Sequence, residues 1–272
     1  MNLSVLQNFK PEHFKMDPFP HIHIPQVLPW SLYKELEEQY PEELMLNGRT
    51  EGFGDMRYQQ KDFDYSRITP LWNAFAEYHT SKYFKDEVIT AFNEAINKHY
   101  KPYYIKYARA DVKGRYDQGP EPMKMEMQFV INAIDSKYIR TPHVDQAREL
   151  FAFLFYFKKF DDKGDDGGLN LYQKTTDKQW RRQGSGREAL PEDIKAVGHI
   201  QYSMNTMVGF LNTVNSIHGV TPRKNPNTVR RYVNIDCHVQ EKLFKFGALF
   251  RKYNRFQTHC TIKCIESKVF VR

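Results

Sequence analysis

The sequence predicts an α+β fold, with helices in the first third of the chain and a strand-rich remainder that closes as a sandwich or jelly roll. Helical spacing of apolar residues is concentrated in residues 1–100. After Lys101 the apolar residues fall in short runs rich in aromatic and β-branched side chains, separated by turn-forming clusters. No long amphipathic segment separates these runs, which argues against alternating βαβ units and favours direct strand-to-strand connections.

Helices are expected in three segments of the first third, over residues 29–39, 69–78 and about 83–99. In the first of them, Leu32 and Leu36 lie four positions apart and form one apolar side. Ser31 is a residue type that caps helix N-termini, and Pro41 ends the segment. The first third of the chain is therefore predicted to be mostly helical.

Strands are expected in six later segments, over residues 103–107, 125–134, 150–157, 169–172, 206–211 and 229–236. The polar segment 174–199, which contains Trp180 and three arginines, is too long for a hairpin turn. Long loops on a β scaffold often serve as lids or binding loops. A binding loop and a merely solvated insertion both remain open for this segment.

The whole chain, residues 1–272, is expected to form a single domain. Its 20 Phe, 17 Tyr and 3 Trp exclude a disordered chain and supply enough apolar surface for a sizeable core. We divide it into a helical part over about 1–100, a β core over about 101–240 and a C-terminal extension over 241–272.

Composition also limits the location and the partners. The longest apolar run, Leu150 to Phe157, is far shorter than the roughly 20 residues that cross a bilayer. No secretory signal is seen at the N-terminus, and three cysteines cannot build a disulfide framework, so a reducing cytoplasmic location is expected. The net charge is +7, but basic and acidic residues alternate, so neither nucleic acid nor a membrane is an expected partner.

The triplet His143-Val144-Asp145 is a candidate for metal ligation. On extended backbone, residues two apart project to the same side, so His143 and Asp145 can face one ion while Val144 faces away. Imidazole nitrogen and carboxylate oxygen suit Fe(II) or Mn(II), but a third ligand is needed. The ordinary alternatives are an exposed histidine before a turn and an aspartate that caps a helix.

His218 is the best candidate for the third ligand. It follows an apolar strand and a polar turn, and it is the first residue of His218-Gly219-Val220, which enters another expected strand. Two histidines and one carboxylate form a facial triad that leaves one face of an octahedral metal open. A buried core histidine is the alternative for His218. Further on, an arginine in the strand-like run 228–236 is placed to hold a carboxylate that reaches in from the metal.

The order of these motifs resembles the 2-oxoglutarate and Fe(II)-dependent oxygenases, and most closely their prolyl-hydroxylase-like branch. The resemblance covers about residues 125–237. In order, the matching segments are His143-Val144-Asp145, a strand ending in Tyr156-Phe157, Gly167-Gly168-Leu169-Asn170-Leu171, Val208-Gly209-Phe210-Leu211-Asn212, His218-Gly219-Val220 and Arg231-Tyr232. It implies a double-stranded β-helix, the cupin-like jelly roll, buttressed by N-terminal helices. The implied activity is that of a dioxygenase that hydroxylates a C–H bond and releases succinate and CO2.

The same resemblance implies the site residues. His143, Asp145 and His218 would bind Fe(II), and Arg231 would bind the distal carboxylate of the cosubstrate 2-oxoglutarate. Strand alternation sends Arg230 and Arg231 to opposite faces, and the usual Arg-Tyr pairing favours Arg231, with Arg230 as the alternative. Tyr156 is a weaker candidate for cosubstrate contact, since core packing is its more ordinary role.

Two rival functions remain open at this stage. One is a metal-binding cupin-like protein, an isomerase or sugar-binding protein, without oxoglutarate-dependent activity. The other is a non-catalytic module that keeps only the fold. The expected substrate is a small molecule or a peptide, and the sequence indicates neither which one nor the oligomeric state.

The cysteines suggest one further alternative. Cys237-His238 and His259-Cys260-x-x-x-Cys264 offer zinc-type ligands, but they lack the close Cys-x-x-Cys spacing of a structural zinc site. Buried, reduced cysteines are the favoured interpretation.

Overall fold

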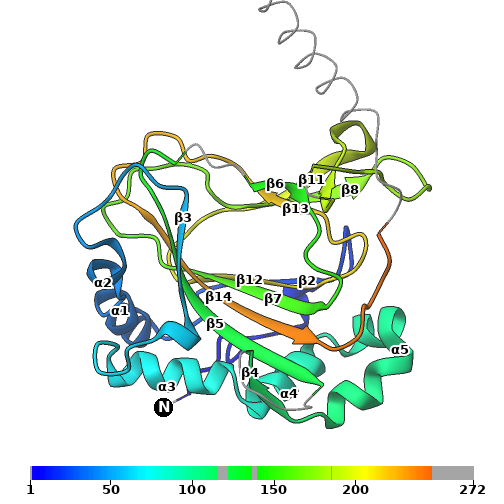
Figure 1. Cartoon of the computed structure of the whole chain (residues 1–272), viewed down its shortest axis with the longest axis horizontal. Helices are drawn as coiled ribbons and strands as arrows, with labels where there is room; N and C mark the ends of the chain where they lie inside the picture. Colours follow the sequence, from blue (N-terminus) through cyan, green and yellow to red (C-terminus); the bar gives the residue numbers. More distant parts are fainter. Residues whose placement is uncertain (1, 116–121, 137–139, 185, 247–272) are drawn as a thin grey trace, which may run out of the picture.

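A computed structural model describes residues 2–115, 122–136, 140–184 and 186–246. Two β-sheets lie over one another, and the helices cover the outer face of the larger sheet (Figure 1). The helices are α1 (Trp30–Glu38), α2 (Glu42–Leu46), α3 (Pro70–His79), α4 (Lys82–Ala91) and α5 (Asn93–Arg109). The architecture is a mixed α+β fold, as the sequence predicts.

The larger sheet contains the central strands of the molecule. Its order is β1-β2-β12-β7-β14-β5-β3, with β4 beside β5, and every described pairing in it is antiparallel except β4 with β5. The bounds are β1 (Phe14–Lys15), β2 (His21–Pro25), β3 (Asp55–Gln59), β4 (Val112–Gly114), β5 (Met123–Asn132), β7 (Glu149–Tyr156), β12 (Thr206–Leu211) and β14 (Arg230–Val239).

The smaller sheet faces it across the interior. Its order is β11-β8-β13-β6-β10-β9, and all of its described pairings are antiparallel. The bounds are β6 (Arg140–His143), β8 (Leu169–Lys174), β9 (Arg182–Gln183), β10 (Glu188–Ala189), β11 (Ile194–Ile200) and β13 (His218–Val220). Short 3-10 helices occur at Pro11–His13, Gln60–Asp62 and Pro191–Asp193.

Strand β7 shows why the central strands are almost continuously apolar. Phe151, Phe153 and Phe155 point into the core shared with the helices, whereas Ala152 and Tyr156 point toward the smaller sheet. A strand covered on both faces needs apolar residues at successive positions, because neither set of side chains reaches water. The larger sheet therefore separates a helix-side core from an interior that lies between the two sheets.

The helices differ from the sequence prediction in detail. In α1 the N-cap position is taken by Pro29, and Ser31 lies within the first turn. The segment expected as one helix over 83–99 is divided at Phe92 between α4 and α5, because Phe92 has φ −97° and ψ 14°. The side chain of Ser81 caps the start of α4 by accepting a hydrogen bond from Phe84 N.

The strand predicted over residues 103–107 is wrong, since these residues belong to α5, which continues to Arg109. Aromatic and β-branched residues favour strands, but tertiary contacts override that preference. Here the buried Lys85 side chain of α4 donates from Nζ to the carbonyl oxygens of Tyr107, Ala108 and Ala110 at 3.2, 3.0 and 3.0 Å. A cation at the C-terminal end of a helix satisfies carbonyls that have no partner within the helix.

Strands β5, β7, β8, β12 and β14 coincide with the other expected strands to within a few residues. The segment 174–199 contributes β9, β10 and β11, so it is part of the smaller sheet. Cys237 is buried in β14 with a free thiol, whereas residues 259–264 of the considered zinc site lie outside the described residues. None of the described helices combines the length and the apolar character needed to cross a membrane.

A buried histidine in the helical layer predicts a pH dependence of stability. His79 of α3 accepts a hydrogen bond from Val5 N at 3.1 Å through Nε2, and burial lowers the pKa of His79 from 6.5 to about 3. Between these pH values the unfolded chain binds a proton that the folded protein does not. Stability is therefore full above pH 6.5 and falls as the pH is lowered, by up to about 1.4 kcal/mol per pH unit.

The variant His79→Gln removes this titration and retains a hydrogen-bonding side chain. We expect urea unfolding at pH 7.5 and pH 5 to show a smaller loss of unfolding free energy for His79→Gln than for the natural protein. Equal losses in the two proteins would show that the pKa of His79 is the same in the folded and unfolded states, which would contradict the prediction.

Candidate metal centre

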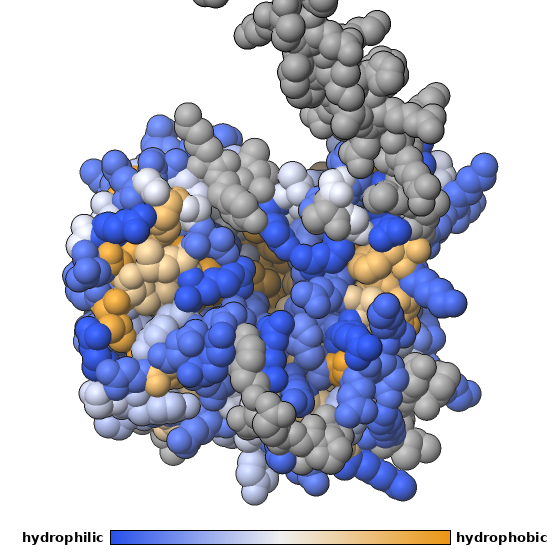
Figure 2. Space-filling view, in the orientation of Figure 1, coloured by the Kyte–Doolittle hydropathy of each residue, from blue (hydrophilic) through white to orange (hydrophobic). Residues whose placement is uncertain are grey.

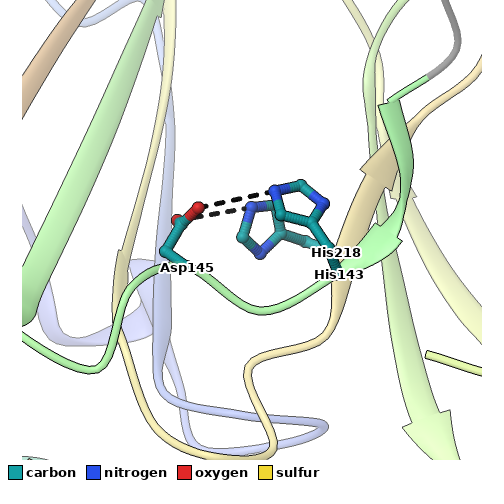
Figure 3. A group of neighbouring side chains, drawn as sticks. All are labelled: His143, Asp145 and His218. Carbon is teal, nitrogen blue, oxygen red and sulfur yellow. Dashed lines mark ion pairs between the residues drawn. The ribbon is translucent and has the colours of Figure 1, made fainter. Parts of the chain in front are cut away.

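His143, Asp145 and His218 meet at one place in the interior (Figure 3). His143 ends β6 and His218 begins β13, and the two residues are direct partners in the antiparallel pairing of these strands. Their ring centroids are 4.4 Å apart. Asp145 lies opposite both rings, with its carboxylate oxygens 3.4 Å from His143 Nε2 and 3.5 Å from His218 Nε2. Strand pairing therefore brings His218 beside His143 and Asp145, although it follows them by more than 70 positions in the sequence.

Backbone hydrogen bonds hold both imidazoles in the orientation that a metal requires. His143 Nδ1 lies 2.8 Å from Thr141 O, and His218 Nδ1 lies 2.9 Å from Ser216 O. In each ring Nδ1 donates to the carbonyl, so Nε2 keeps its lone pair and faces Asp145. The Phe210 ring packs against His218 with centroids 4.4 Å apart.

The charges of the cluster are also those of a cation site. Burial lowers the pKa of His218 to about 4, so this ring is neutral at physiological pH. Burial by itself would raise the pKa of Asp145, but the neighbouring His218 and His143 bring it well below its usual range. A neutral imidazole at His218 and an ionised carboxylate at Asp145 are protonation states that a divalent metal binds.

Among the described residues, this is the one group of three or more such side chains with ligand atoms all within 4.8 Å of one another. Arg140 Nε donates to His143 Nε2 at 3.0 Å, so a metal ion bound by His143 would have to replace that hydrogen bond. The donor set of two nitrogens and one oxygen fits Fe(II) or Mn(II).

The group of side chains His143, Asp145 and His218, called the metal cluster below, opens into a cavity of about 370 Å³ between the two sheets. In Figure 2, which has the same orientation as Figure 1, a recess near the centre of the molecule is bordered by hydrophilic side chains. The cavity is lined from the smaller sheet by the metal cluster and from the larger sheet by every second residue of β14, namely Arg230, Tyr232, Asn234 and Asp236.

Arg230 lies inside this cavity and is held from several sides. Its Nε donates to Gly167 O at 2.7 Å, and its Nη1 donates to Asn132 Oδ1 at 3.1 Å. The guanidinium carbon lies 5.3, 5.1 and 4.4 Å from the ring centroids of Tyr156, Tyr202 and Tyr232. Nη2 is buried and makes no hydrogen bond with any described residue. The cavity therefore contains a fixed cation with one donor group available.

Arg231 points the opposite way, toward the helices. Its Nη1 donates to Glu42 Oε2 at 3.0 Å, its Nη2 pairs with Glu37, and its Nε donates to Phe157 O at 3.2 Å. The expectation that Arg231 enters the barrel and Arg230 points out is therefore wrong. The alternation of β14 separates the two arginines as predicted, but the register of β14 turns Arg230 inward.

Tyr156 takes part in the enclosure of Arg230. Its side chain is fully buried, its ring packs edge-on against Tyr202 with centroids 5.3 Å apart, and its hydroxyl oxygen has no hydrogen-bond partner among the described residues. Burial raises the pKa of Tyr156 to about 12. The residue is therefore a neutral part of the core that packs against the Arg230 guanidinium.

Sequence reasoning missed most of the polar lining. Glu149 and Asp236 line the cavity, and burial raises the pKa of Glu149 well above its usual value and that of Asp236 to about 7. Arg57, Arg115 and Arg187 line it as well. Charged residues at alternate positions of a buried strand were the signal for Asp236, whereas Arg187 lies in a loop and gives no such signal.

Comparison with known proteins supports the fold. No family model matches the chain, and no curated protein matches it. A solved prolyl 4-hydroxylase of Phytophthora capsici aligns with a TM-score of 0.51 and 15% sequence identity, over 88% of this chain and 66% of that one. The chain shares its fold with a prolyl 4-hydroxylase.

Other solved structures align at lower TM-scores. A Pseudomonas putida prolyl-4-hydroxylase gives a TM-score of 0.46 at 12% identity, over 81% of this chain and 93% of that one. HygX from Streptomyces hygroscopicus, solved with nickel, 2-oxoglutarate and hygromycin B bound, gives 0.42 at 12% identity, over 81% of this chain and 83% of that one.

Proposed function

We propose that this protein is a non-haem Fe(II) and 2-oxoglutarate-dependent dioxygenase that hydroxylates a C–H bond of a small molecule or peptide. One observation carries the proposal: a single cavity contains both a His-Asp-His ligand group and a buried arginine with an unused donor. We also propose that the two facing sheets form the double-stranded β-helix of this enzyme class.

The residues divide into two roles. His143, Asp145 and His218 would hold Fe(II) and leave positions open for other ligands. Arg230 would bind the far carboxylate of 2-oxoglutarate, because a buried guanidinium donor without a protein partner makes a strong, charge-assisted hydrogen bond with a carboxylate. Iron with 2-oxoglutarate supplies the activation of dioxygen, coupled to oxidative decarboxylation that yields succinate and CO2.

The surrounding residues prepare the arginine for this role. Gly167 O and Asn132 Oδ1 fix two edges of the Arg230 guanidinium, and the three tyrosine rings enclose its faces. Aromatic faces stabilise a guanidinium without forming the in-plane hydrogen bonds that a carboxylate needs. The direction of Nη2 is therefore set before the cosubstrate binds.

The test is a turnover assay of the purified full chain with Fe(II), 2-oxoglutarate and air. We expect succinate to form, even without the natural substrate, and to require both Fe(II) and dioxygen. A metal-binding cupin-like protein would bind the ion but leave 2-oxoglutarate unchanged. If the metal binds and neither succinate formation nor 2-oxoglutarate binding is detected, the proposal is wrong and the cupin alternative replaces it.

A further inference from the structure

The hairpin β9–β10 places Arg187 directly beside the metal cluster. Glu188 of β10 is the pairing partner of His143, on the side of β6 away from β13. Arg187 O accepts a hydrogen bond at 3.2 Å from the amide of Val144, the residue between two of the metal-cluster side chains. The backbone at Arg187 is thus fixed to the same segment that positions His143 and Asp145.

The Arg187 side chain is half-buried and lines the cavity together with the metal cluster. Its guanidinium makes no hydrogen bond or ion pair with any described residue. The Glu149 carboxyl lines the same cavity and lies within range of the Arg187 charge, but it forms no ion pair with Arg187. The other arginines that line the cavity each donate to a protein group, namely Arg57 to Asp55, Arg115 to Glu126, Arg140 to His143 and Arg230 to Gly167.

The segment that carries Arg187 is anchored. The Trp180 side chain is 2% exposed, and its Nε1 donates to Val214 O at 2.7 Å. Arg181 forms a two-point ion pair with Asp193, with Nη2 and Nε at 2.6 and 3.0 Å from the carboxylate oxygens. Arg182 Nη1 donates to Gly186 O at 3.0 Å across the hairpin turn. These contacts show that the described residues of the segment 174–199 are an ordered part of the smaller sheet and not a loose insertion.

The Arg187 guanidinium is only half-buried and has no partner among the described residues, so its donors remain available to a ligand in the cavity. The guanidinium group is also the side chain best suited to bind carboxylate or phosphate, because its donors match two anion oxygens at once. Arg230 and Arg187 reach the cavity from opposite sheets, so an anion on one leaves the other available.

We propose that Arg187 binds an anionic group of the substrate, a carboxylate or a phosphate monoester, and thereby holds the substrate beside the metal cluster. This inference rests on the proposed function. It assigns a binding role to the segment 174–199 and predicts that the substrate is an acidic small molecule or carries an acidic group near the reacting carbon.

The first test measures succinate formation by the full chain with Fe(II), 2-oxoglutarate and matched pairs of compounds. The pairs are L-amino acids with their carboxamides and nucleoside 5′-monophosphates with their nucleosides, so the two arms separate carboxylate from phosphate recognition. We expect an anionic member to raise turnover while its neutral counterpart does not. Stimulation by neither member, or equally by both, would overturn the proposal.

Variants then test whether the stimulation by an anion depends on Arg187. Arg187→Gln is expected to lower kcat/KM for the stimulating anion about tenfold or more, since a charge-assisted hydrogen bond is lost. Lys195→Gln is the matched control, because it removes the same charge from an exposed position on β11 in the same segment, and we expect no change. The KM for 2-oxoglutarate is measured separately in each variant. A rise in that KM with no loss of anion selectivity would assign Arg187 to the cosubstrate and contradict the proposal.

A second test does not depend on turnover, so it separates failure of this inference from failure of the proposed function. Phenylglyoxal modifies accessible guanidinium groups, and peptide mapping by mass spectrometry reports the rate at Arg187 in the metal-free protein. Inorganic phosphate is expected to slow modification at Arg187. An unchanged rate in the presence of phosphate would show that this guanidinium does not bind anions.

Discussion

Replacing Asp145 with alanine is expected to abolish metal-dependent turnover and to weaken Fe(II) binding more than a hundredfold. Loss of even an outer partner of a metal ligand costs about 10–100-fold in affinity, and Asp145 is the carboxylate of the cluster itself. The two remaining ligands are imidazoles, so the variant would have no negative charge in direct contact with the ion. Equilibrium dialysis with Fe(II) under anaerobic conditions measures the affinity, and succinate formation measures turnover.

Glu149→Gln is the matched control for this prediction. Glu149 lines the same cavity, but burial raises its pKa, and it is not part of the cluster of ligand atoms. We expect its amide variant to bind Fe(II) nearly as well as the natural protein. Equal loss of affinity in both variants, or an Asp145→Ala protein that binds iron normally, would place the metal elsewhere in the cavity.

Replacing Arg230 with alanine is expected to raise the KM for 2-oxoglutarate by about thirtyfold to a few thousandfold. Removing one partner of a buried, charge-assisted pair costs about 2–5 kcal/mol, and about 1.4 kcal/mol corresponds to each factor of ten. Iron binding should persist, because Arg230 does not contact the metal cluster. The measurement is the dependence of succinate formation on 2-oxoglutarate concentration.

Arg231 provides the comparison. Its guanidinium binds Glu37 and Glu42 on the helical side, so Arg231→Ala is expected to lower the unfolding free energy by about 3–5 kcal/mol and to leave the KM for 2-oxoglutarate unchanged. If the alanine variant does not fold, the KM for 2-oxoglutarate is measured in Arg231→Lys, which keeps the positive charge. If the KM rises in the Arg231 variants and not in Arg230→Ala, the assignment of the two arginines is reversed.

The sequence was sufficient to predict the fold class and most strands. A strand such as β7 is recognisable because a run of large apolar residues lies between charged residues. It was insufficient for residues 103–107, where local preference favours a strand. The helix there depends on Lys85, which is distant in sequence and stabilises the end of α5 through carbonyl oxygens. Contacts of this kind leave no local pattern.

The convergence of His143, Asp145 and His218 was predictable for two reasons. Two-residue spacing on extended backbone aims two of the side chains at one point, and the motif order suggested the third. Alternation also showed that Arg230 and Arg231 separate, but it could not show which of them faces inward, because that depends on the register of β14 against β5 and β7. Arg187 lies in a loop outside the strand pattern, so only the structure shows that its side chain lines the cavity.

The most direct test of the central claim is an anaerobic titration of the full chain with Fe(II) and 2-oxoglutarate, followed by visible absorption. Chelation of Fe(II) by a 2-keto acid produces a charge-transfer band that neither component gives alone. We expect this band in the natural protein, its absence in Asp145→Ala, and its appearance only at higher 2-oxoglutarate concentration in Arg230→Ala. A natural protein that binds Fe(II) and still shows no band with saturating 2-oxoglutarate would contradict the account.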